Sequence, residues 1–491
     1  MAENKNAGFL ENYFHLKENN TDVKTEVLAG VTTFVAMAYI LIVNPQMLAD
    51  PFNIMGQAEY AAQVSNGVFF ATCLIAFFGT FLMSVYAKLP FAQAPGMGLN
   101  AFFAYTVILT MGYTYGEALS IVFISGILFI FITIIGFREA VVRAIPNCVK
   151  TAISAGIGLF LALIGLKNAS LVVANGSTFV GMVDFSLWNS TGDAEGMVTA
   201  GGMQYPVDVY HGMIASAIIA LIGLVVIGAL HARKIKGSII IGIIVATIIG
   251  IPLGVTSFHG FSIDIGRQFQ DFLDVSLFKM DFAGLFKNST NVFQMIFTII
   301  MIVVSFSIVD MFDTIGTLLG TAKQAKMLDK NGDMPRMKQA MMSDALATTA
   351  GACLGTSTAT TFVESSAGIA EGGRTGLTSL VTSLLFLCSL IIAPFVSIIP
   401  GAATAPALIF VGVLMISSMK ELNFSDMSEA IPSFMTVAIM PFTYSIANGI
   451  AAGLITYVLI KLLSGKAKEI KPFTVVICLL FVLRFAFMIT G

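Results

Sequence analysis

Residues 354–376 read LGTSTATTFVESSAGIAEGGRTG and interrupt a markedly apolar part of the chain. The stretch is rich in Ser, Thr and Gly and carries the acid Glu364. At membrane depth, irregular and polar backbone survives only where protein or a water-filled cavity surrounds it. The stretch therefore predicts a broken membrane span beside a cavity. The alternative is a small-residue helix packed closely on its neighbours, which leaves Glu364 unexplained.

The composition of the whole chain requires a membrane protein. Of 491 residues, 57% are hydrophobic and 11% are charged, with a mean hydropathy of +0.89. Soluble domains are about 45–50% apolar and about 25% charged. These values exclude an ordinary soluble enzyme, a disordered chain and a nucleic-acid-binding protein. Long apolar runs such as 291–309 favour helical spans over the short alternating strands of a barrel.

The hydropathy pattern predicts 14 spans, and the basic residues give their orientation. With a cytoplasmic N-terminus, 21 of the 26 basic residues fall on the cytoplasmic side and four fall outside, as the positive-inside rule requires. A fifteenth apolar stretch, 472–489, carries Arg484 in its middle, and its course is left open. The 14 predicted spans are 26–46, 65–87, 91–108, 116–137, 147–166, 209–230, 237–255, 292–320, 338–354, 356–370, 375–398, 405–419, 429–446 and 447–464.

A second broken span lies in the first half of the chain. Pro90–Tyr105, PFAQAPGMGLNAFFAY, holds two prolines and two glycines that a regular helix does not accommodate together. It is the third span of the first seven, and the stretch around Glu364 is the third of the second seven. An odd number of spans per half inverts the second half, and paired breaks in inverted repeats indicate a transporter binding site.

Four carboxylates are predicted to lie at membrane depth: Asp310, Asp313, Asp344 and Glu364. A charge there costs at least about 2.5–3.5 kcal/mol, and no Lys or Arg lies beside these acids in their spans. Substrate or proton binding is therefore the leading interpretation, while a hydrogen-bonding role in the core remains open for Asp310 and favoured for Asp344. None of the four histidines lies in the middle of a span, so a histidine proton relay is not expected.

Several motifs resemble those of a known family. Glu26–Leu48 reads EVLAGVTTFVAMAYILIVNPQML, and the stretches 94–105 (APGMGLNAFFAY), 310–320 (DMFDTIGTLLG) and 343–376 follow in order. Over nearly its whole length, the chain resembles the AzgA-like purine permeases of the nucleobase–cation symporter family, which also includes uracil and xanthine permeases. The resemblance implies a transporter of purine nucleobases, coupled to protons, and not an enzyme.

The resemblance also implies the fold class and the domains. It predicts an all-α polytopic membrane protein of 14 spans in two inverted seven-span repeats, with a short strand in spans 3 and 10. Relatives of this fold often form dimers, so a homodimer is left open. The predicted parts are an N-terminal tail (1–25), a core domain (26–137 and 291–398), a gate domain (138–290 and 399–464) and a C-terminal hydrophobic segment (465–491).

The resemblance assigns roles to individual residues. Asp313 and Glu364 would hydrogen-bond the nucleobase, and Asn100 would be the polar residue of span 3 that the purine branch needs. Asp344 would support a polar core network. Thr317 occupies the position where the uracil permease has a histidine. A proton relay through that histidine therefore cannot be assigned to this chain.

Two phenylalanines and one aspartate complete the predicted set. Phe102 and Phe362 are candidates for stacking on the base, although phenylalanine is abundant, with 41 residues, and packing is the favoured alternative. Asp310, three residues before Asp313, shares its helix face and is assigned to the proton-coupling or core network. No metal or cofactor is expected.

The chemistry of a 6-oxopurine fits these residues. A carboxylate accepts hydrogen bonds from N1–H and, in guanine, from the 2-amino group. Adenine lacks N1–H, so hypoxanthine and guanine are favoured and adenine stays open. The expected mechanism is elevator-like alternating access in the cell membrane. The core would slide along small-residue helices such as Ile153–Gly165, with a proton neutralising the loaded core.

Three other functions remain as alternatives. An anion transporter of the sulfate or bicarbonate type on the same fold is disfavoured by two acids at the site. An intramembrane aspartyl protease lacks its GxGD motif here, and Asp310 and Asp313 share one helix. A channel is not excluded, although broken helices in inverted halves favour a carrier.

Overall fold

The computed structural model describes residues 9–135, 146–193, 196–257, 265–286, 292–324, 327, 334–396 and 398–489. Among these residues, nine helices are long and apolar enough to cross a membrane: Val23–Ile54, Ala58–Ala87, Tyr115–Ile134, Asn147–Asn168, Val207–Ala232, Ile296–Ile315, Gly376–Phe395, Gly401–Glu421 and Ile446–Leu463. Met97–Thr110, Ser238–Gly250 and Pro472–Leu483 are shorter apolar helices. The chain is thus a helical polytopic membrane protein, and the count of 14 spans and the inverted repeat stay predictions.

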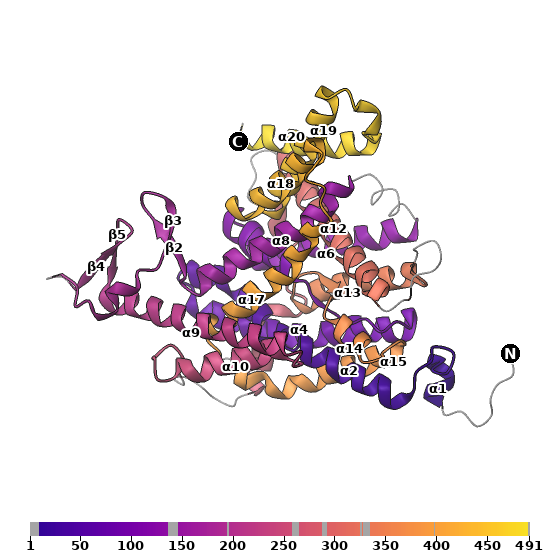
Figure 1. Ribbon diagram of the computed structural model, residues 1–491, viewed down its shortest axis with the longest axis horizontal. Helices are drawn as coiled ribbons and strands as arrows, with labels where there is room; N and C mark the ends of the chain where they lie inside the picture. Colours follow the sequence, from indigo (N-terminus) through magenta and orange to yellow (C-terminus); the bar gives the residue numbers. More distant parts are fainter. Residues whose placement is uncertain are drawn as a thin grey trace.

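One set of helices surrounds the two broken spans (Figure 1). In this set α2 packs on α14 and α15, α4 packs on α3, α13 and α15, and α6 packs on α12 and α13. Their bounds are α2 Val23–Met37, α3 Ile40–Ile54, α4 Ala58–Leu82, α6 Tyr115–Ile134, α12 Val292–Gln324, α13 Met337–Leu354, α14 Ser365–Ala370 and α15 Gly376–Cys388.

A second set of helices packs mainly on itself. Here α8 packs on α17 and α18, α9 packs on α10 and α17, and α18 packs on α19. Their bounds are α8 Asn147–Asn168, α9 Val207–Ala232, α10 Ser238–Gly250, α17 Gly401–Ile416, α18 Met427–Phe442 and α19 Ile446–Leu463.

The remaining helices are mostly short. They are α1 Phe9–Phe14, α5 Met97–Ala101, α11 Ile265–Asp271, α16 Ala393–Val396 and α20 Pro472–Ile489. The described residues also include three π-helical segments (Met83–Ala87, Phe102–Thr110 and Phe272–Ser276) and five 3₁₀ segments (Phe185–Asn189, Gly284–Phe286, Ser389–Ile392, Ser417–Glu421 and Ala467–Glu469). Helix α20 contacts α19 and α12. Its apolar stretch Pro472–Leu483 is shorter than a membrane span, so its course stays open.

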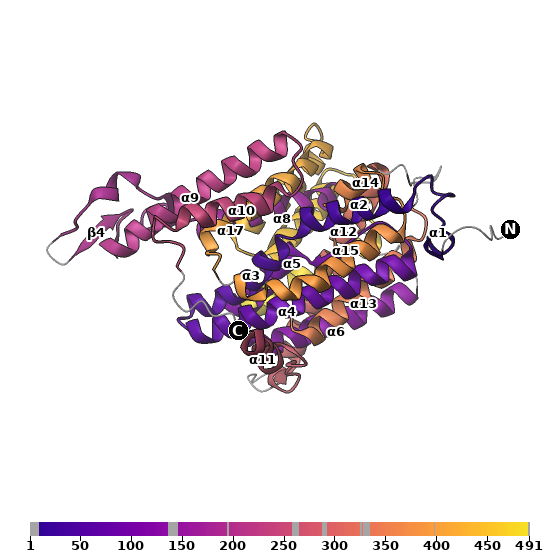
Figure 2. The same ribbon diagram turned by 90° about the horizontal axis from the view of Figure 1, so that it is seen from below.

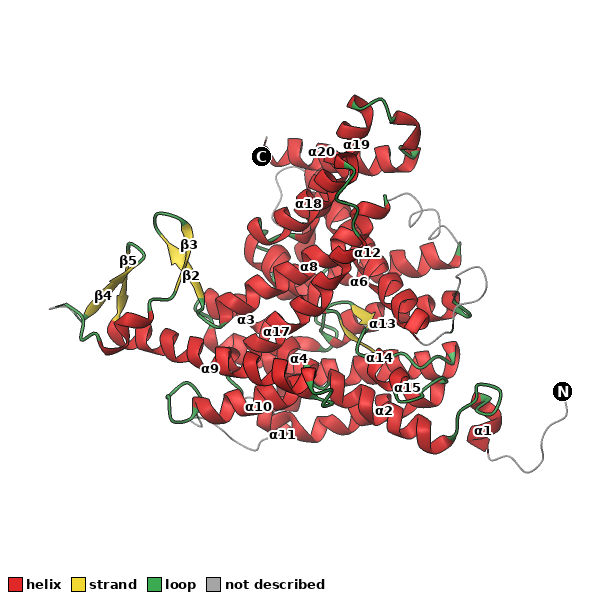
Figure 3. Cartoon of the chain, in the orientation of Figure 1, coloured by secondary structure: helices red, strands yellow, loops and turns green. Residues whose placement is uncertain are grey.

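Both broken spans hold the short strand that the resemblance implied. β1 (Gln93–Pro95) and β6 (Ala359–Thr361) form an antiparallel pair with Gln93 opposite Thr361. Figure 3 shows this pair enclosed by helices near the middle of the molecule. Residues more than 260 positions apart in the sequence are thereby joined at one buried point.

The loop 167–208 departs from the all-α expectation. It folds into two hairpins, β2 (Val172–Asn175) with β3 (Phe179–Met182) and β4 (Met197–Ala200) with β5 (Met203–Pro206). The turn between β4 and β5 is Gly201–Gly202, with φ of 58° and 77°, the positive values that a two-residue hairpin turn needs. In Figures 1 and 2 the hairpins project at the end opposite the N-terminus.

The glycines of helix α8 do not form the predicted sliding surface. A side chain at Gly158 would lie 2.7 Å from the carbonyl oxygen of Gly412, and one at Gly165 would lie 2.8 Å from that of Ala405, both in α17. These glycines therefore let α8 and α17 pack backbone to backbone within the second set of helices. Ile157 of α8 faces the broken span after β1 instead, because a side chain at Gly98 of α5 would lie 2.7 Å from it.

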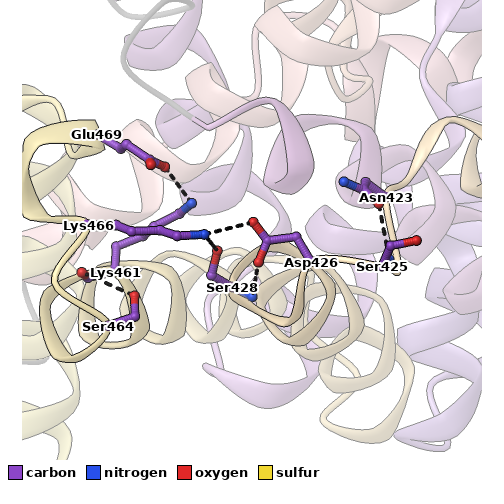
Figure 4. A network of polar contacts seen from close by, with 8 residues as sticks. All are labelled: Asn423, Ser425, Asp426, Ser428, Lys461, Ser464, Lys466 and Glu469. Atoms are coloured by element: carbon purple, nitrogen blue, oxygen red, sulfur yellow. Dashed lines mark hydrogen bonds and ion pairs between the residues drawn. The ribbon is translucent and has the colours of Figure 1, made fainter.

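A polar network joins the ends of α18 and α19 (Figure 4). Asp426 accepts from the N–H of Ser428 at 2.8 Å and from Lys466 at 3.0 Å. These partners hold the pKa of Asp426 below its ordinary value. Lys461, almost fully buried, donates to Glu469 at 2.6 Å. The network fixes the turn after α19 at the membrane end predicted to be cytoplasmic.

Glu26 ties α2 to the start of α15. Its buried carboxylate accepts from the backbone N–H groups of Arg374 at 2.8 Å and Thr378 at 3.1 Å, which lie around the N-terminus of α15.

We expect Glu26→Ala to lower the free energy of unfolding by about 1–3 kcal/mol, because buried donors lose their acceptor. The melting temperature of the detergent-solubilised protein measures this, with the exposed Glu59→Ala as control. Equal melting temperatures for the two variants would contradict this role.

Candidate functional site

The strand pair forms the centre of the site. Both strands are fully buried, and two flanking hydrogen bonds extend the ladder, from Gly96 N–H to Thr358 O and from Phe362 N–H to Ala92 O, each 3.0 Å long. Gly96 lies so close to Thr360 that a Cβ would approach its side chain to 2.9 Å. The pair therefore satisfies the backbone groups of both broken spans away from water.

A short helix follows each strand and carries one predicted site residue. Glu364 occupies the N-cap position of α14, three residues after β6. Asn100 lies in α5, five residues after the end of β1. Asn100 is fully buried, and within the described part of the chain neither its amide nitrogen nor its oxygen has a hydrogen-bonding partner. A buried amide without a partner is costly in a native protein and is consistent with a ligand-binding group.

Glu364 and Asp313 lie near one another. The hydroxyl of Tyr39, at the junction of α2 and α3, donates to Oε1 of Glu364 at 2.7 Å. Asp313 lies on α12, which packs on α14 and on β6. Among the described residues, no hydrogen bond to another side chain holds Asp313 in place. Two acids from different helices of the second half of the chain thus lie beside the strand pair, and of the two Glu364 is held by Tyr39.

The other two membrane acids belong to a hydrogen-bonded network. Asp344 is fully buried and accepts from the Gln93 amide of β1 at 3.3 Å and from the Thr314 hydroxyl of α12 at 2.9 Å. Asp310, 1% exposed, accepts from the Thr348 hydroxyl at 3.1 Å. These bonds link α12 and α13 to β1. They are compatible with the core-network role assigned to both acids, which stays a prediction.

The remaining predicted residues differ in their surroundings. The ring of Phe102 packs edge-on against Phe306 of α12, with centroids 4.8 Å apart, and is 1% exposed. This contact favours packing over stacking on a ligand for Phe102. Phe362 is 7% exposed and directly follows β6. Thr317 is partly buried one turn after Asp313, and its backbone oxygen accepts from the Thr321 hydroxyl at 2.6 Å.

Two residues at the site were not singled out from the sequence. Tyr39 is one of 11 tyrosines, in a span that reads as uniformly apolar, and Gln93 lies between two prolines. Each was detectable only as a lone hydrogen-bonding side chain inside a predicted span. Their partners are 325 and 251 positions away in the sequence, so spacing alone could not identify them.

Comparison with known proteins gives consistent results. The Permease family model matches residues 24–191 and 190–452. The adenine permease AdeP of Escherichia coli is 37% identical over 98% of this chain and 96% of its own. The guanine/hypoxanthine permease PbuO of Bacillus subtilis is 38% identical over 96% of this chain and 99% of its own.

Solved structures support the fold alone. The transmembrane domain of the cyanobacterial bicarbonate transporter BicA has a TM-score of 0.56 at 14% identity, covering 87% of this chain and 97% of that one. SLC26A9 has a TM-score of 0.55 at 13% identity, covering 90% of this chain and 66% of that one. By the family match over most of its length and by its relatives, the chain belongs to the permease family, as an AzgA-like purine permease.

Proposed function

We propose that the protein is a secondary active transporter that imports purine nucleobases together with protons across the cell membrane. The observation that carries the proposal is the placement of Glu364, at the N-cap of α14, and of Asp313, on the adjacent helix α12, beside the buried strand pair, in a chain of this family. Hypoxanthine and guanine offer the N–H donors that these carboxylates accept. One relative is named an adenine permease and another a guanine/hypoxanthine permease, and their sequence identities to this chain are similar. Adenine therefore remains a second substrate to test.

The same acids supply a reason for coupling to protons. Two carboxylates near one another at membrane depth are costly when both are ionised. A proton taken up with the base removes one charge before the loaded site moves. The acids also disfavour an anion transporter, because a sulfate or bicarbonate ion would face two negative groups.

Radiolabelled hypoxanthine, guanine, adenine and uracil would test this proposal in cells that lack their own purine carriers. Purine uptake that competes with unlabelled purine and collapses with a protonophore is the expected result. Absence of purine uptake, with the protein present in the membrane, would overturn it. Purine uptake that persists with the protonophore would overturn only the proton coupling and leave purine transport standing.

Elevator-type movement is the mechanism we propose, with the helices around the strand pair as core and those around α8 as gate. At one contact between them, Asp50 of α3 lies 3.5 Å from Lys167 of α8 and accepts from the Tyr105 hydroxyl at 2.7 Å. The Tyr105 ring meets Tyr444, between α18 and α19, at 5.5 Å. Such contacts must break and re-form if the core slides past the gate.

Cross-linking across this contact is expected to stop transport. In a background without the five native cysteines, Asp50→Cys and Lys167→Cys would be joined with a reducible bifunctional thiol reagent. Uptake should fall to the level of cells without the transporter and return on reduction.

A matched control joins Thr151→Cys to Ser418→Cys within the gate, where the Ser418 hydroxyl lies 3.3 Å from Thr151 O. That link should leave uptake intact. Full uptake with Asp50 and Lys167 linked would contradict the movement.

A further inference from the structure

The phenol of Tyr39 is in an unusual position for a tyrosine in a membrane protein. It lies at the midpoint of the 32-residue helical stretch Val23–Ile54 and is 1% exposed. Tyrosines of membrane helices are enriched at the interfaces, where the hydroxyl reaches water. A buried hydroxyl at mid-span needs a specific partner, and here that partner is Oε1 of Glu364 at 2.7 Å.

The local backbone brings Tyr39 to this place. The regular helix is interrupted at Ala38 and Tyr39, between α2 and α3, and the next turn is tightened by a hydrogen bond from Leu41 N–H to Ala38 O of 3.2 Å. The direction of the Tyr39 side chain is therefore set by this break between α2 and α3.

Close packing of α2 on α14 fixes the other partner. Gly368 of α14 lies so near α2 that a Cβ there would approach Ala29 O to 2.5 Å. Glu364 begins the same short helix one turn earlier. The distance between the phenol and the carboxylate is thus set by two elements that cannot separate without losing this contact.

We propose that Tyr39 is a positioning residue for purine binding, which holds the Glu364 carboxylate in the orientation that receives the N–H edge of the base. The inference rests on the proposed function. A carboxylate oxygen has two lone pairs. Oε1 of Glu364 can therefore accept a hydrogen bond from Tyr39 while Oε1 and Oε2 both remain able to accept hydrogen bonds from the base. Without the phenol, the carboxylate would rotate more freely, so its contact with N1–H, and in guanine its second contact with the 2-amino group, would form in only a fraction of molecules.

Tyr39→Phe removes only the hydroxyl and tests the inference. We expect the Kd for hypoxanthine or guanine to rise about tenfold, the order of one hydrogen bond to a charged group. In a Glu364→Gln background the same change should have no further effect, because residues that act through one another are not additive. Purine binding to purified protein would be measured by equilibrium dialysis, with Tyr86→Phe, a half-exposed tyrosine, as control.

The outcomes separate the two proposals. If the wild type binds no purine, the proposed function fails and this inference fails with it. If the wild type binds and Tyr39→Phe binds equally well, or if its effect is unchanged in the Glu364→Gln background, only the positioning role is overturned. Should Tyr39→Phe prove unstable, Gly368→Ala gives a second test. It should push α14 away from α2 and weaken purine binding, and wild-type binding by that variant would overturn the role.

Discussion

Asp313→Asn and Glu364→Gln are each expected to reduce purine uptake about 10- to 150-fold, because hydrogen bonds to charged groups contribute about 1.5–3 kcal/mol and each 1.4 kcal/mol is a factor of ten. Each substitution keeps the size of the side chain but replaces a charged acceptor by a neutral amide. The amide still accepts one hydrogen bond, yet its NH₂ group faces the N–H edge of the base. The variants should therefore fold and reach the membrane but bind the base poorly.

Initial rates of hypoxanthine uptake, normalised to the amount of protein in the membrane, would measure this effect. Glu18→Gln is the matched control, since the Glu18 side chain is 68% exposed outside the predicted spans. It should transport like the wild type. Wild-type rates in either Asp313→Asn or Glu364→Gln would remove that residue from the binding site.

Asp344→Asn should have a different result, loss of the folded protein. The Asp344 carboxylate accepts from donors on two separate elements, Gln93 of β1 and Thr314 of α12. An asparagine turns one acceptor oxygen into a donor, which then faces another donor in a buried site. Each buried hydrogen-bonding group left without its partner costs about 1–3 kcal/mol, so the two lost contacts together remove a large share of a typical stability of about 5–15 kcal/mol.

The melting temperature and the yield of detergent-solubilised protein distinguish this from a binding defect. Asp344→Asn should lower both strongly, whereas Asp313→Asn should change them little while losing uptake. Wild-type stability of Asp344→Asn, combined with lost uptake, would contradict the structural role and move Asp344 into the binding site.

The sequence predicts the broken spans well because polar groups in hydrocarbon are costly. Prolines, glycines and an acid inside apolar stretches are conspicuous for that reason, and both predicted breaks hold a strand. The sequence does not predict the hairpins in 167–208, although Gly201–Gly202 is a two-residue turn signal, because the segment reads as a polar loop between two spans.

Partners across the fold could not be predicted. Small residues in α8 indicate that another helix approaches closely, but the sequence does not say which helix, and the structure gives α17. The same holds for Glu364, whose partner Tyr39 lies 325 positions away. Periodicity and composition report on local structure, whereas these contacts depend on how distant elements pack.

An experimental structure with hypoxanthine bound is the most direct test of the account. We predict the base beside the β1–β6 pair, with at least one of its N–H groups within about 3 Å of a carboxylate oxygen of Glu364 or Asp313, the ordinary length of a hydrogen bond. A base bound elsewhere in the protein, or bound here with both carboxylates turned away from it, would contradict the assignment of this site.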